Sequence, residues 1–216
     1  TAWRDATERF QELQAAYEAV NPLNRRRYDL GVVGLVSLRT DLMDACEAGD
    51  SKRVRRLLAD SADVHATDVT GRTALLFAAG AASLEILRAL LQHHADVGVR
   101  NCAGHTCVMF AVGAGLKVDS PKAVERALQH LEAVRLLLDE GAPVDGATGY
   151  GLTALMLACA SGRFSMVELL LERGADPKAS SDIGLTALVM ASDKGHLQAV
   201  QRLLAAAADP NHRYGA

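Results

Sequence analysis

Apolar and polar positions recur along this chain with a period of 33 residues. Five threonines, each opening a mostly apolar segment, are separated by steps of 33, 33, 47 and 33: Thr40, Thr73, Thr106, Thr153 and Thr186. A second marker, read as ADV, ADV, APV, ADP and ADP, begins at residues 62, 95, 142, 175 and 208. Both markers indicate five units with one insertion of 14 residues inside the third.

Each unit has the pattern of two short amphipathic helices. In the fourth, apolar residues at helical spacing predict a first helix over 154–161, which Gly162 ends, and a second over 165–172. Gly174 is typical of a left-handed C-terminal cap. The polar stretch 176–184 suits a β-hairpin finger that leads into the next unit. Because neither helix can bury its apolar face alone, the units must stack into a mostly α solenoid.

The segments GLTALMLACASGRFSMVELLLERGAD (151–176) and GLTALVMASDKGHLQAVQRLLAAAAD (184–209) resemble ankyrin repeats. The resemblance covers about residues 40–214 and divides the array 40–216 into units at about 38–70, 71–103, 104–150 (insertion at about 116–130), 151–183 and 184–216. The family's usual histidine is replaced by Leu76, Met109, Met156 and Val189, so stability should depend more on apolar burial. In three units, the position where the family usually has a capping glycine is occupied by another residue: Ser61, His94 and Ala207.

The first unit differs from the others in polarity. Asp41 and Asp44 stand where other units have apolar or small residues. A polar outer face is what a terminal repeat needs, so we expect this unit to cap the array.

The resemblance implies a binding surface on the finger tips and the inner helices. Equivalent positions of the repeat that map to this surface give the candidate residues Val69, Arg72, Phe77, His105, Phe110, Tyr150, Leu152, Ile183, Leu185 and Met190. For Phe77, Phe110, Leu157 and Met190, packing between neighbouring inner helices is the favoured alternative, because such positions are often half-buried. Tyr150, Leu152, Ile183 and Leu185 would form an apolar patch on adjacent tips, which favours a lasting protein partner.

The insertion provides a second candidate surface. Ser120 before Pro121 is a helix-start signal, so the second helix of unit three should run from about Pro121 to Asp139, two to three turns longer than its siblings. Val124, Leu128 and Leu131 fall on one of its faces. This face could rest on neighbouring outer helices or could protrude and contact another protein.

Residues 1–31 have a different pattern, followed by a linker at 32–39. Trp3, Phe10 and Tyr17 recur every seven residues and form an apolar stripe. The segment FQELQAAYEAVNPLNRRRYDLG (10–31) resembles the third helix and closing turn of a J-domain. The His-Pro-Asp loop through which a J-domain stimulates its ATPase partner occurs nowhere in this sequence, so the resemblance implies packing more than co-chaperone activity.

Composition narrows the function further. The chain has 216 residues and a net charge of -3, so no global field attracts nucleic acid, and no apolar run approaches the roughly 18 residues of a membrane span. The four cysteines have no scaffold or metal spacing, which indicates a reducing intracellular compartment: the cytoplasm, or an organelle if Thr1 is a processed terminus. No catalytic motif or cofactor fingerprint is present.

The sequence therefore predicts a non-catalytic protein-binding scaffold or adaptor, such as an accessory subunit of a larger complex, with no cofactor, metal, nucleic acid or membrane partner. The alternative is a J-domain co-chaperone that selects clients through its ankyrin array.

Overall fold

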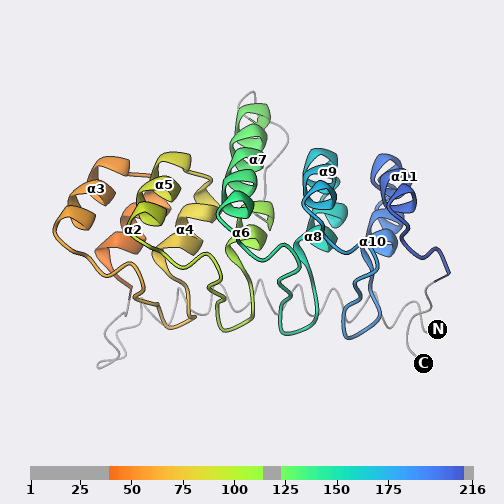
Figure 1. The fold of residues 1–216 in the computed structure, drawn as a ribbon, viewed down its shortest axis with the longest axis horizontal. Coiled ribbons are helices and arrows are strands. Elements are labelled where there is room, and N and C mark those ends of the chain that lie inside the picture. The colour runs from red at the N-terminus through yellow and green to blue at the C-terminus, as the bar shows by residue number, and fades with distance from the viewer. Residues whose placement is uncertain (1–38, 114–122, 212–216) are drawn as a thin grey trace, which may run out of the picture. The chain divides into compact units, whose positions relative to one another are not determined.

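The computed structural model describes residues 39–113 and 123–211, which lie within one compact unit, Arg39–Ala216. Within these residues, the first helices of successive units pack against one another in one row, and the second helices pack in a second row (Figure 1). The pairs are α2 (Asp41–Ala48) with α3 (Ser51–Ala59), α4 (Ala74–Ala81) with α5 (Leu84–Gln92), α6 (Cys107–Gly113) with α7 (Ala123–Asp139), α8 (Ala154–Ala160) with α9 (Phe164–Glu172), and α10 (Ala187–Asp193) with α11 (Leu197–Ala205). The predicted α-helical repeat solenoid is confirmed.

The repeated threonine starts the first helix of each unit. Its side chain accepts a hydrogen bond from the backbone N–H three residues later, at 3.3 Å in Thr40, Thr106 and Thr186 and 3.4 Å in Thr153. This cap satisfies one of the free N–H groups at a helix start. Thr73 differs, because its buried hydroxyl has no hydrogen-bond partner among the described residues.

The C-terminal caps of the second helices are left-handed, as the sequence predicts. Gly174 has a φ of 86°, and Ser61, His94 and Ala207 hold φ values of 62°, 61° and 63° in the same slot. A residue with a Cβ is strained there by roughly 1–2 kcal/mol. Ala82, at the end of a first helix, adds a fourth such residue, with a φ of 51°, that the sequence analysis did not anticipate.

Apolar side chains fill the slot where the family usually has histidine. Leu76, Met109 and Met156 are fully buried between neighbouring units. Their slot in the last unit, at Val189, is only half-buried. The cohesion of the array therefore comes from apolar burial at this slot, as expected from the sequence.

The first unit presents charge on its outer side. Asp41 and Asp44 are exposed, and they pair with Arg53 (2.7 Å) and Arg39 respectively. Arg39 also pairs with Glu47 and stacks on the ring of Phe77 at 4.6 Å. The unit therefore buries its apolar residues against α4 while polar groups remain outside, as a terminal repeat requires.

The insertion lengthens the start of α7. This helix has 17 residues, whereas α3, α5, α9 and α11 each have nine, and in Figure 1 its upper end rises beyond its neighbours. His130 occupies the slot that Arg163 holds before α9, so the added helical residues are 123–130. The predicted start at Pro121 lies outside the described residues.

His130 attaches the added turns to α6. It is buried, and its Nδ1 donates to the carbonyl of Ala111 at 2.8 Å. Arg163 donates from the next unit to Val112 at 2.7 Å. Burial, and the positive charges of Arg163 and Arg126, lower the pKa of His130, although the bond to Ala111 acts in the opposite direction.

Successive fingers are built around one side chain near each tip. Asn101 accepts from the N–H groups of Ala103 (3.1 Å) and His105 (2.8 Å), and the Thr148 hydroxyl accepts from the equivalent N–H groups of Tyr150 and Leu152. In the first finger Asp68 plays this part, and in the last finger Ser181 does so. Four different residue types thus close the same turn.

Backbone hydrogen bonds join each finger to the next. Cys102 donates to the carbonyl of Thr70 at 2.9 Å, Gly149 to Ala103 at 3.0 Å and Asp182 to Tyr150 at 3.1 Å. The close approach needs glycine. At Gly151 a Cβ would lie 2.9 Å from the Ser181 Cα, and its φ of 77° is left-handed as well.

The J-domain-like residues 1–31 and most of the linker predicted at 32–39 lie outside the described residues. None of the described helices is long and apolar enough to cross a lipid bilayer.

We predict that Ser61→Gly raises the stability of the array, because glycine removes the strain of a left-handed residue. The free energy of unfolding should rise by about 0.5–1 kcal/mol, measured by urea denaturation. Gly174→Ala, in the same slot and with open space around the added Cβ, should lower it by a similar amount. A stability loss in Ser61→Gly would contradict this account.

Gly151→Ala should destabilise the array more than Gly174→Ala does. Both introduce a Cβ at positive φ, but only the Gly151 substitution also forces two fingers apart. The extra loss should be about 1–3 kcal/mol, the usual cost of overpacking, measured by the same denaturation experiment. Equal losses in the two variants would show that the fingers separate freely.

Acid should destabilise the array through His130. Its folded-state pKa lies below the unfolded value of about 6.5. As the pH falls below 6.5, the unfolded chain takes up a proton that the folded chain resists, so stability declines until the folded pKa is passed. His130→Gln should flatten this decline in thermal melts. An unchanged pH profile in His130→Gln would exclude this cause.

Candidate protein-binding surface

The finger face consists of three rows of residues that the repeat places side by side. The tips carry Thr70, Ala103, Tyr150 and Ile183, the finger bases carry Arg72, His105, Leu152 and Leu185, and the first helices carry Phe77, Phe110, Leu157 and Met190. The hydrogen bonds between fingers make this surface continuous. Its character changes along the array, because units two and three contribute cationic and aromatic side chains and units four and five contribute mainly apolar ones.

The most exposed of the predicted finger residues are apolar. Tyr150 is 60 % exposed, Ile183 45 % and Val69 43 %. Leu152 and Leu185 are half-buried at the bases of the Tyr150 and Ile183 fingers. Water therefore contacts an apolar patch on two neighbouring fingers, of the kind that marks interaction sites.

Phe77 and Met190 contribute little accessible surface. Both are only 6 % exposed. The Phe77 ring contacts two guanidinium groups, Arg39 at 4.6 Å and Arg72 at 4.4 Å. The contact with Arg39 ties the first unit to the second, so Phe77 serves mainly to hold the array together.

Arg72 is held in place by a buried carboxylate. Its Nε and Nη2 donate to Asp68 Oδ2 at 2.9 and 2.8 Å. Burial alone would raise the pKa of Asp68, but hydrogen bonds from Thr70 and Arg72, together with the Arg72 charge, outweigh burial and lower it. The pair fixes the first finger and leaves part of Arg72 accessible.

In the third unit, His105 and Phe110 occupy the repeat positions that Arg72 and Phe77 occupy in the second. Their ring centroids are 6.0 Å apart in an edge-to-face arrangement, and both side chains are half-buried. Burial lowers the pKa of His105, which favours the neutral ring near pH 7. This part of the face is therefore aromatic with little added charge.

The added turns of α7 form a second exposed apolar surface. Val124 is 71 % exposed and Leu128 58 %, one turn apart, while Leu131 is half-buried. His130 faces α6 instead. Of the two alternatives the sequence left open, the accessibility of Val124 and Leu128 favours the protruding surface.

Arg100 is a finger residue that sequence reasoning missed. Its Nε donates to the Gly104 carbonyl at 3.3 Å, and its Nη2 donates to the Ala147 carbonyl of the next finger. The equivalent position holds threonine, alanine and serine in the other fingers (Thr67, Ala147 and Ser180). The one arginine among small residues was the only sequence signal that Arg100 has a special contact.

Metal-ligating and thiol side chains are the remaining candidates for chemistry among the described residues. They contain no group of three His, Cys, Asp or Glu side chains that could hold a metal ion. Cys46, Cys107 and Cys159 are buried, and burial raises the pKa of each thiol to about 12, so none is a ready nucleophile.

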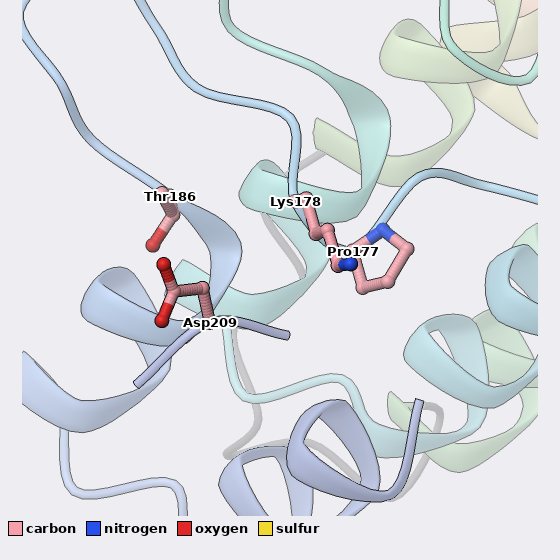
Figure 2. Close-up of a pocket in the computed structure, with 4 residues that line it drawn as sticks. All are labelled: Pro177, Lys178, Thr186 and Asp209. Atoms are coloured by element: carbon pink, nitrogen blue, oxygen red, sulfur yellow. The ribbon is translucent and has the colours of Figure 1, made fainter. Parts of the chain in front are cut away.

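One small hollow lies beside the last finger. It is lined by Pro177, Lys178, Thr186 and Asp209, with a volume of about 110 Å³ (Figure 2). The Thr186 hydroxyl points toward the Asp209 carboxylate there and also accepts the hydrogen bond that caps α10. The hollow is too small for a typical ligand pocket.

Comparison with known families agrees with this geometry. A family model described as ankyrin repeats (3 copies) matches residues 42–125 and 122–214. A comparison with curated proteins gave no match. Threonine-capped helix pairs, hydrogen-bonded fingers and the matched ranges together show that the chain belongs to the ankyrin-repeat family.

Proposed function

We propose that this protein is a non-catalytic scaffold or adaptor that binds another protein through its finger face and serves as an accessory subunit of a larger complex. The observation that supports this most directly is the exposure of Tyr150 and Ile183 on fingers joined by a hydrogen bond. Ankyrin repeats generally mediate protein–protein interactions, and a rigid apolar patch of this kind gains free energy when a partner covers it.

The shape of the patch suits a lasting partner. Tyrosine is favoured at interface hot spots because it buries a large area at a low cost in side-chain entropy. Around Tyr150, the half-buried Leu152 and Leu185 supply apolar depth, and the backbone bonds hold the fingers in one conformation. A partner therefore meets a surface that is already ordered.

The added turns of α7 provide a second contact in this proposal. Val124 and Leu128 lie one turn apart with Glu125 and Arg126 beside them, which is the pattern of an amphipathic helix. A partner that reaches both surfaces would gain affinity through two linked contacts.

The co-chaperone alternative rests on the J-domain-like segment at about residues 3–31 alone. The family comparison begins at residue 42 and adds nothing for that segment. The decisive observation is the full-length transcript: a His-Pro-Asp loop upstream of Thr1 would support this alternative, and an upstream sequence without that loop would exclude it.

We predict that Tyr150→Asp combined with Ile183→Asp abolishes partner capture, because two carboxylates would be desolvated in an apolar interface. Capture would be measured by quantitative pull-down and mass spectrometry with the full chain. Both side chains are substantially exposed, so the free energy of unfolding should change by less than about 0.5 kcal/mol.

Two controls make this result interpretable. Gln198→Asp with Gln92→Glu adds the same charge at exposed sites on the second helices and should leave capture intact. Val124→Asp with Leu128→Asp tests the α7 surface separately. Retained capture in the finger variant and loss in the α7 variant would move the principal site to α7.

A further inference from the structure

Two exposed residues of opposite charge flank the finger that carries Tyr150. Arg100 donates to the carbonyl of Ala147 on one edge of this finger, and the backbone N–H of Asp182 donates to the carbonyl of Tyr150 on the other edge. Both side chains are exposed. In the described part of the chain, neither has an ion-pair partner, since Arg100 bonds only to backbone carbonyls and no cation lies within salt-bridge distance of Asp182.

Two other charges of the finger face and the inner helices have ion-pair partners. The Asp68 carboxylate holds Arg72 on the first finger, and Asp193 at the end of α10 pairs with Lys194 at 3.3 Å. Among the described residues, Arg100 and Asp182 have no such partner, and they lie on the fingers before and after the one that carries Tyr150.

We propose that the patch of Tyr150, Leu152, Ile183 and Leu185 binds an amphipathic helix of a partner protein, with a carboxylate of that helix beside Arg100 and a basic side chain beside Asp182. This inference rests on the proposed binding function and specifies the chemistry of its partner. Complementary charges at the two edges would fix the position of the helix along the array, while apolar contact would supply most of the affinity.

The spacing of the repeat suits a helical partner. Packed helices lie about 8–10 Å apart, so equivalent residues on neighbouring units are separated by about that distance. Apolar residues seven apart on a helix are separated by about 10.5 Å along one face. Two such residues could contact the Tyr150 finger and the Ile183 finger at the same time.

The inference can be tested with labelled synthetic peptides of about 14 residues, long enough to carry two leucines seven apart on a helix. Three share this apolar core and differ only in their flanks: glutamate on one side and lysine on the other, glutamate on both, or lysine on both. A fourth has the mixed flanks but serine in place of both leucines. Binding to the full chain would be followed by fluorescence polarisation.

The mixed-flank peptide should bind best, by roughly two- to fivefold over either single-sign peptide, which is the range of an exposed ion pair. Arg100→Glu should shift the preference to the lysine-flanked peptide, and Asp182→Lys to the glutamate-flanked one. The preference should weaken at high salt. The serine peptide should not bind.

Equal affinity for the three leucine peptides, unchanged preferences in the charge variants, or no binding at all would each overturn the inference. Those outcomes are separable from failure of the proposed function. Loss of natural partner capture in Tyr150→Asp with Ile183→Asp would still support a finger-face site whose partner has different chemistry, whereas capture unaffected by that variant would reject the site itself.

Discussion

The close contact between neighbouring fingers and neighbouring first helices is the constraint on which the rest of this structure depends. No helix of a unit can bury its apolar face alone, so each inner helix is covered by the next. The fingers follow the same spacing, and the bonds from Cys102, Gly149 and Asp182 to the preceding finger hold them in register. A surface assembled from separate turns thereby behaves as one rigid face.

The constraint also explains which departures from the repeat are tolerated. The caps at Ser61, His94 and Ala207 are left-handed because the chain must turn there into a finger, whatever residue occupies the slot. Stacking supplies enough free energy to maintain that strain. By contrast, Gly104 and Gly151 lie where a neighbouring finger approaches so closely that a Cβ would meet its backbone. Glycine is retained there for space as well as for conformation.

Function in this array depends on residues that stacking leaves free. Slots that face the next unit are filled by leucine, methionine and alanine. Slots on the finger tips vary from Thr70 and Ala103 to Tyr150 and Ile183. The helical insertion adds an exposed surface without disturbing the stack, since His130 fills the slot of Arg163 and continues its role of binding an α6 carbonyl. The same scaffold can therefore carry two distinct contact surfaces.

Local sequence patterns were enough to predict the repeat, its helix pairs, the left-handed caps and the apolar character of the fingers, because a period of 33 residues repeats each signal several times. Which apolar residues remain accessible emerged from the packed array alone. Phe77 and Tyr150 were both candidates for the binding face, yet Phe77 is enclosed by Arg39 and Arg72 while Tyr150 extends into solvent. Arg100 could not be recognised either, since its importance comes from contact with a finger 47 residues away in the chain. Accessibility and long-range contact depend on what packs nearby in space, which local sequence patterns do not specify.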